Sequence, residues 1–309
     1  MMKMTLLFLT WISLYSFAVS GEEANKVQTL SQFSTYLDGQ LENRKSVETT
    51  DSNSAMNAFN QHSWSFWKAH LDGYQENPEN YHTVLEKYYR LKERYPIENS
   101  LDLEAFDSVI ESYRRFDRRN TLPDNPFLFV GSSSIVYWEI ARAFPSLPVI
   151  NRGFGGASMN DILHHYDDVI KPHNPRALVI YCDIDIEMGA EPESVIDLYK
   201  TLIMKVEQDF PSAHIILLSM KPTMVDHILG RHIWRNKKAA NEMLKTLSQK
   251  RDNRHFVNVG DSLLRDDGRV NSDLFSDGMH LNESGYKQWN PLIKLTLDPI
   301  AQAREVAVQ

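Results

Sequence analysis

Two short stretches at opposite ends of the chain combine residue types that can perform nucleophilic chemistry. The serines Ser132–Ser134 follow Gly131 at the end of an apolar run. A serine at a strand-to-helix turn presents its hydroxyl outward, beside free helix N–H groups. Asp277 precedes His280 by three residues, so its carboxylate can reach Nδ1 and fix the tautomer that accepts a serine proton. Together they indicate a catalytic triad in the chain order Ser, Asp, His.

A glycine-rich stretch, Asn151–Gly156, follows a second apolar run. Three of its last four residues are glycine, which lets backbone N–H groups turn into a cavity and suits an anion, either a phosphate or an oxyanion. Alone, such a stretch is more typical of a flexible loop. A nucleotide-binding domain is disfavoured because no Gly-x-Gly-x-x-Gly turn follows the first strand and no Gly-Lys-Ser/Thr element is present.

The elements that must position these residues are predicted from residue 119 onward. Longer amphipathic stretches, such as Ser194–Gln208 and Trp234–Gln249, alternate with short apolar runs. The runs predicted as strands are Phe127–Val130, Pro148–Asn151, Ala177–Tyr181, His214–Ser219 and Phe256–Val259. This alternation predicts βαβ units and a parallel sheet with reactive groups at the carboxyl ends of its strands.

The N-terminal part has a different character. Residues 1–20 combine Lys3, an apolar core and a small-x-small end, Ala18–Ser20, which is typical of an export signal. The run is shorter than the ~20 residues of a membrane-spanning helix, so an uncleaved anchor is the second choice. Residues 21–118 are predicted as a helical extension, partly disordered at its start. Its aromatic residues, which recur at helical spacing around 64–71 and 103–116, are interpreted as core.

The three functional stretches together resemble the SGNH, or GDSL-type, hydrolases. The similar blocks are Phe129–Ile135, Val149–Gly156 and Asp277–Asn282, within a resemblance that covers roughly residues 110–297. It implies a flavodoxin-like three-layer α/β/α sandwich for residues 119–300. It also implies a serine esterase that forms a covalent acyl-enzyme. By motif, Ser133 is the nucleophile, His280 the base and Asp277 its partner. The backbone amides of Ser133 and Gly156 form the oxyanion hole. The other two serines, Ser132 and Ser134, are the alternatives for the nucleophile.

One block departs from that family. Its usual Gly-x-Asn-Asp stretch supplies an asparagine amide to the oxyanion hole, whereas this chain has Asp183, Ile184 and Asp185 after the third strand. The stretch is one residue short, with Ile184 opposite the asparagine. Asp183 facing the hole would repel a developing oxyanion, unless its pKa were raised enough to let it donate. Alternatively, the two carboxylates cap the next helix or face solvent. A second hypothesis is therefore a catalytically impaired protein that binds ligands or partners on the same fold.

Composition limits the partners. The 33 basic and 41 acidic residues give a net charge of −8, which disfavours nucleic acid. The single cysteine, Cys182, excludes an internal disulfide and a Cys-rich zinc module. A metal hydrolase using His164, His165, Asp167 and Asp168 is disfavoured because adjacent histidines on a helix diverge. We expect an exported, periplasmic or secreted esterase without cofactor or metal, and without a stable membrane span after signal cleavage. Its expected substrate is a short acyl ester, possible carriers being a carbohydrate or lipid.

Overall fold

The computed structural model describes residues 28–42, 52–92 and 104–308. The predicted signal peptide and the start of the extension lie outside the described residues. The chain divides into two compact units. Among the described residues, the first comprises 28–42, 52–92 and 227–231, and the second comprises 104–226 and 232–308.

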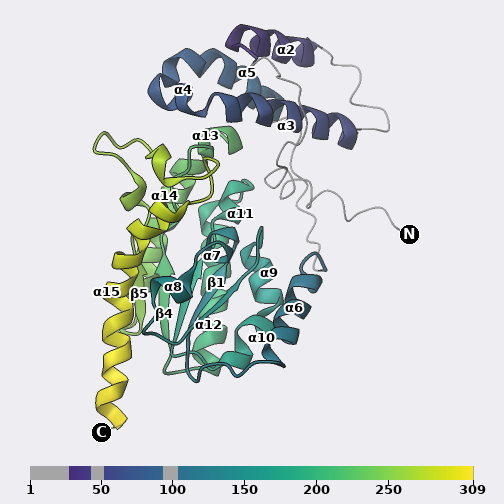
Figure 1. The fold of residues 1–309 in the computed structure, drawn as a ribbon. Helices are drawn as coiled ribbons and strands as arrows, with labels where there is room; N and C mark the ends of the chain where they lie inside the picture. The colour runs from purple at the N-terminus through teal and green to yellow at the C-terminus, as the bar shows by residue number, and fades with distance from the viewer. Residues whose placement is uncertain (1–27, 43–51, 93–103, 309) are drawn as a thin grey trace. The chain divides into compact units, whose positions relative to one another are not determined.

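The first unit is helical (Figure 1). Its described helices are α2 (Leu30–Glu42), α3 (Ser52–Ala69), α4 (Leu71–Glu76), the 3₁₀ helix η1 (Pro78–Tyr81) and α5 (His82–Lys92). Aromatic rings make its core. Phe33 stacks on Phe66 with ring centroids 3.8 Å apart, and Trp67 is fully buried beside them. These side chains therefore stabilise the unit through burial and ring packing, as predicted for the residues around 64–71.

Residues 227–231, which come from between β4 and α14, belong to this helical unit. The imidazole of His227 stacks on Tyr74 with a centroid separation of 3.6 Å. Arg231 makes a bidentate ion pair with Glu86, with N–O distances of 2.6 and 3.0 Å. A segment that sequence reading assigned to the α/β domain therefore packs with the N-terminal helices.

The second unit is built on a five-stranded, fully parallel sheet in the order β2-β1-β3-β4-β5. Its strands are β1 (Phe127–Gly131), β2 (Val149–Gly153), β3 (Ala177–Tyr181), β4 (His214–Leu218) and β5 (Arg254–Val257). Every residue of β1 and β3 is buried. The continuous apolar runs thus reflect a sheet covered on both faces, which confirms the predicted α/β class.

Helices cover both faces of the sheet (Figure 1). The helices of this unit are α6 (Asp107–Asp117), α7 (Ser133–Val136), α8 (Ile140–Ala143), α9 (Met159–His164), α10 (Tyr166–Val169), α11 (Ile184–Glu187), α12 (Pro192–Asp209), α14 (Ile233–Ser248) and α15 (Glu283–Val308). Helix α13 (Asp226–Leu229), apart from Asp226, falls within residues 227–231 of the helical unit. Short 3₁₀ turns are η2 (Lys171–His173), η3 (Asp261–Leu263) and η4 (Ser272–Leu274). On one face, Phe129 and Val179 share a core with Trp138 and with Trp289 of α15. On the other, α9 packs on β1 and α14 on β4 and β5.

Helix α6 belongs to the second unit, although sequence analysis grouped it with the extension. Its Ile110 is buried, and Phe106, just before the helix, packs edge-on against Phe154 with centroids 5.1 Å apart. Phe116, by contrast, is 49% exposed, so it does not share the buried face predicted for it. The aromatic residues around 103–116 are therefore only partly core, and Phe106 supports the loop that follows β2.

Among the described residues, none of the helices combines the length and apolar character that crossing a bilayer requires.

Candidate active site

The turn after β1 places Ser133 at the first position of α7. Gly131 has φ +151, and a Cβ there would lie 1.8 Å from the carbonyl oxygen of Tyr181 on the neighbouring strand. Only glycine fits this turn. Ser132 then donates its backbone N–H to that same carbonyl at 3.3 Å, which fixes the entry to the helix. Ser133 is half-buried, whereas Ser132 and Ser134 are each 2% exposed. The middle serine is therefore the accessible one.

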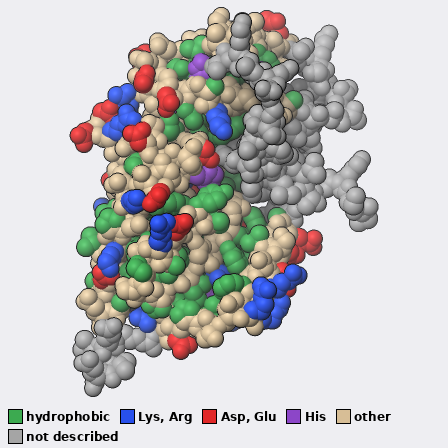
Figure 2. Space-filling model, in the orientation of Figure 1, with side chains coloured by type: hydrophobic (Ala, Val, Ile, Leu, Met, Phe, Trp, Pro, Cys, Tyr) green, Lys and Arg blue, Asp and Glu red, His purple; other side chains and the backbone are tan. Residues whose placement is uncertain are grey.

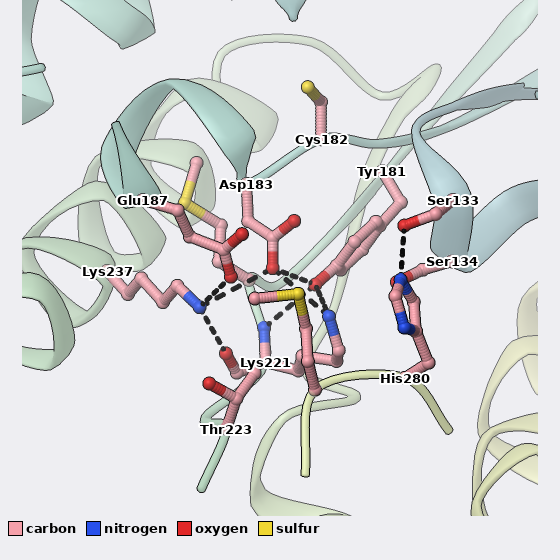
Figure 3. A network of polar contacts seen from close by, with 12 residues as sticks. Ser133, Ser134, Tyr181, Cys182, Asp183, Glu187, Lys221, Thr223, Lys237 and His280 are labelled. Atoms are coloured by element: carbon pink, nitrogen blue, oxygen red, sulfur yellow. Dashed lines mark hydrogen bonds and ion pairs between the residues drawn. The ribbon is translucent and has the colours of Figure 1, made fainter. Parts of the chain in front are cut away.

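The imidazole of His280 bridges Ser133 and Asp277. Its Nε2 lies 3.0 Å from the Ser133 hydroxyl (Figure 3). Its Nδ1 lies 2.7 Å from Oδ2 of Asp277. The sequence separation between Ser133 and His280 is 147 residues, so only the fold brings them together. Asp277 can hold the imidazole in the tautomer whose Nε2 accepts the serine proton. The three residues singled out in the sequence thus form one continuous hydrogen-bonded chain.

The loop around Asp277 makes its carboxylate a fixed part of the site. Its Oδ1 accepts the backbone N–H groups of Met279 and His280 at 3.0 and 2.7 Å. Burial alone would raise the pKa of Asp277, but the hydrogen bonds and charge of His280 outweigh burial and hold the pKa at about 2. Asp277 is therefore ionised at neutral pH, as an acid that supports an imidazolium must be.

The glycine-rich loop starts beside the serine turn. Gly153 pairs with Gly131 across the sheet, and the N–H of Phe154 donates to the Gly131 carbonyl at 3.0 Å. Gly156 follows with φ +83, a conformation that favours glycine. In this loop, which lies wholly within the described chain, the amides of Gly155 and Gly156 donate to no protein acceptor. They are thus available to a ligand, as expected for donors to an anion.

The carboxylate of Asp183 is engaged in a buried ionic network (Figure 3). Its Oδ2 lies 2.5 Å from the Tyr181 hydroxyl, 3.3 Å from Lys221 Nζ and 3.5 Å from Lys237 Nζ. Lys237 also pairs with Glu187 at 2.7 Å and with Asp226 at 2.8 Å. Burial raises the pKa of Asp183, but the two ammonium groups outweigh burial and lower it below its usual value. Asp183 is therefore a paired anion. The idea of a protonated, donating Asp183 is wrong, and so is the idea of a solvent-facing one.

Asp185 is also buried and serves the backbone. Its Oδ2 accepts the N–H of Met159, the first residue of α9, at 2.9 Å and lies 3.6 Å from Cys182 Sγ. The prediction of a helix-capping role therefore applies to Asp185, although the helix is α9 rather than the one that follows in the chain. Ile184 begins α11 between the two carboxylates. Its hydrocarbon side chain offers no hydrogen-bond donor.

Comparison with known proteins identifies the family. The family described as GDSL-like lipase/acylhydrolase matches residues 132–288, about half of the chain. The chain belongs to this family. It is therefore a hydrolase that acts on ester bonds. No curated protein sequence matches the chain.

Solved structures share the fold of this GDSL-like hydrolase. A proposed platelet activating factor from Streptococcus pneumonia has 21% identity and a TM-score of 0.58, covering 67% of this chain and 97% of its own. A proposed acylhydrolase from Bacteroides fragilis has 19% identity and a TM-score of 0.54, covering 61% and 95%. A GDSL-like lipase from Bacteroides thetaiotaomicron has 17% identity and a TM-score of 0.52, covering 63% and 98%. At these identities the likeness establishes the SGNH hydrolase fold alone.

The ionic network beside the hydrolase site contains residues that sequence reasoning missed. Lys237 and Glu187 were not singled out in the sequence. A signal for Lys237 was present. It lies four residues after Ile233 and three before Ala240, on the face of α14 that is otherwise apolar. A lysine on a buried helix face requires carboxylate partners, which a sequence alone does not identify.

No group of three or more His, Cys, Asp or Glu side chains in the described chain is arranged to hold a metal ion. The histidines considered as ligands, His164 and His165, do not share the single helix expected for them. Helix α9 ends at His164, and α10 begins at Tyr166. The two imidazoles meet edge to face with an interplanar angle of 77°, so they do not converge on one point.

Proposed function

We propose that the protein is a serine esterase that hydrolyses short acyl esters through a Ser133–His280–Asp277 triad. The single observation that carries this proposal is the hydrogen-bonded chain through His280, 3.0 Å to Ser133 and 2.7 Å to Asp277. This spacing lies within the reach that proton transfer to a general base needs. The serine with the accessible hydroxyl is also the one that contacts the imidazole.

The chemistry follows from these contacts. The Ser133 Oγ attacks the acyl carbon while its proton passes to Nε2 of His280. The ester C–O bond then breaks, and the leaving alcohol takes that proton from Nε2. Water next attacks the acyl-enzyme in the same way, which releases the acid and restores Ser133. The ionised Asp277 stabilises the imidazolium in both halves of this cycle.

The oxyanion of each tetrahedral intermediate would be bound by two backbone amides, those of Ser133 and Gly156. The free amide of Gly156 and the position of Ser133 at a helix start support this role. Ile184 contributes no third donor. Because one donor is typically worth about 10²–10³ in rate, we expect slow but measurable turnover.

Substrate size and location are the remaining parts of the proposal. We favour short acyl groups on a small or glycan carrier. We also favour an exported enzyme, because of the charge pattern and the apolar run at the N-terminus. A second candidate function is a binding module on the same fold. The aliphatic Ile184 in place of an amide donor is the observation that favours it.

Covalent labelling distinguishes the two candidates. A fluorophosphonate probe and p-nitrophenyl acetate would be applied to the wild type and to Ser133→Ala. We expect labelling and hydrolysis by the wild type, and the loss of both in the variant. Ser132→Ala and Ser134→Ala serve as matched controls that keep the labelling. An unlabelled, inactive wild type would contradict the esterase and favour the binding module.

A further inference from the structure

An exposed aromatic residue borders the candidate site on the side of the imidazole. Tyr137 is 55% exposed, and its ring centroid lies 5.1 Å from that of His280, at an interplanar angle of 86°. It follows the nucleophile by four residues, and its backbone N–H donates to the Ser133 carbonyl at 3.0 Å. The short helix α7 therefore holds the exposed ring and the reactive hydroxyl in a fixed relation.

The direction of catalysis decides which half of an ester lies nearest to this ring. In the proposed function the leaving oxygen receives its proton from Nε2 of His280, so this oxygen must approach the imidazole to about 3 Å. A substituent on that oxygen then extends past His280, where Tyr137 stands. The acyl group is held instead at Ser133 and the oxyanion donors. Tyr137 thus borders the alcohol side of the ester rather than the acyl side.

The surroundings of the ring indicate what kind of alcohol fits. Val136 is the neighbouring exposed apolar residue, 40% exposed. The next exposed side chains along the chain are charged, since Glu139 and Arg142 form an ion pair with side-chain exposures of 68% and 77%. A single exposed ring is a small apolar surface for a long alkyl chain. A pyranose ring presents both an apolar face and hydroxyl groups, which suit an exposed aromatic ring that charged residues follow in the chain.

We infer that Tyr137 is a specificity-determining residue that stacks on a sugar ring in the leaving-alcohol position, which makes the substrate an acylated glycoside. This inference rests on the proposed function and adds the identity of its alcohol. Tyr137 takes no part in proton transfer. It binds the carrier of the acyl group and so orients the ester oxygen toward His280.

The kinetic test compares two acetate esters that differ only in the alcohol. The ratio of kcat/KM for a mono-acetylated methyl glucopyranoside to kcat/KM for ethyl acetate would be measured in the wild type and in Tyr137→Ala. We expect the ratio to fall about 3- to 10-fold, the range that one aromatic contact provides. Tyr137→Phe keeps the ratio. Phe116→Ala, which removes a 49% exposed ring on α6, also keeps it. An unchanged ratio in Tyr137→Ala would overturn the inference.

A binding measurement separates this inference from the proposed function. The same acetylated glucoside would be titrated by ligand-observed NMR against Ser133→Ala and against Ser133→Ala with Tyr137→Ala. We expect Kd to be about 3- to 10-fold higher for the double variant. That result with an inactive wild type would refute the esterase and leave the stacking of a sugar on Tyr137 supported. Equal Kd values with an active wild type would refute the role of Tyr137 in sugar binding but not the esterase. If Tyr137→Ala lowered kcat/KM for dodecyl acetate more than kcat/KM for the acetylated glucoside, the alcohol would be a lipid and the inference of a sugar would be refuted.

Discussion

Asp183, which follows β3, and Lys221, which follows β4, form a buried ion pair with 3.3 Å between Oδ2 and Nζ. Both side chains are at most 4% exposed. Asp183 lies in the stretch where the resemblance to SGNH hydrolases implies an asparagine amide and an aspartate. The charge of Asp183 is therefore compensated within the protein core. This leaves Ile184 as the residue at which a donor is missing.

Restoring that donor is expected to accelerate catalysis. Ile184→Asn places an amide N–H₂ at the start of α11, at the position that the resemblance puts opposite the family's asparagine. Because an oxyanion donor is typically worth about 10²–10³ in rate, we expect kcat for p-nitrophenyl acetate to rise at least ~10-fold. Ile184→Leu is the matched control and has no such effect. Unchanged kcat in a folded Ile184→Asn would mean that residue 184 does not face the oxyanion.

Removing the charge that supports the imidazole is expected to abolish most turnover. In Asp277→Asn the neutral amide cannot stabilise an imidazolium. Its N–H₂ would donate to Nδ1 of His280, which leaves the ring proton on Nε2, where the serine proton has to be accepted. A loss of about 10³–10⁴ in kcat is expected, as in other triads. The measurement is steady-state hydrolysis at neutral pH, where the wild-type carboxylate with its pKa of about 2 is ionised. Asp273→Asn, an exposed aspartate in the same region, is the control. Full activity in Asp277→Asn would rule out the proposed role.

The buried ammonium of Lys237 is expected to matter more for stability than for chemistry. It pairs with Glu187 and Asp226 and lies 3.5 Å from Asp183, so Lys237→Met leaves three buried carboxylates with less compensation. Breaking such pairs typically costs about 3–5 kcal/mol. Urea unfolding would measure this loss. Lys238→Met, at the neighbouring exposed position, should cost no more than ~1 kcal/mol, the worth of its contact with Trp234. Similar losses for both variants would show that the network contributes little.

The same network predicts a pH dependence of stability. Burial and the charge of Asp183 raise the pKa of Glu187 from 4.5 to about 7. A raised pKa in the folded state adds stability below pH 4.5, and this stability is lost as the pH rises through about 7. Glu187→Gln removes that dependence. As the pH rises from 4.5 to 7, we therefore expect the unfolding free energy of Glu187→Gln to increase relative to that of the wild type.

Parallel unfolding titrations of wild type, Glu187→Gln and the control Glu193→Gln, whose side chain is exposed, would measure this change. The control should follow the wild type throughout. A constant difference between Glu187→Gln and wild type across this range would show that Glu187 does not titrate there.

The sequence by itself determined the α/β class and the candidate residues for catalysis. Hydrophobic runs such as Ala177–Tyr181 are local signals, since a strand buried on both faces is apolar at each position. The Asp277 and His280 pair is local too, because three residues separate them. Gly131 is also a local signal, since a glycine at the end of a strand indicates a tight turn, and this turn tolerates no side chain.

Tertiary structure decided the contacts between residues that are distant in the chain. Ser133, just after β1, and His280, just before α15, meet across 147 positions only in the folded chain. The charge of Asp183 is compensated in part by Lys237, which lies on a helix 54 positions later in the chain. Charge compensation in a core depends on distances that no local pattern encodes. The sequence therefore named the chemical groups, and the fold decided which of them act together.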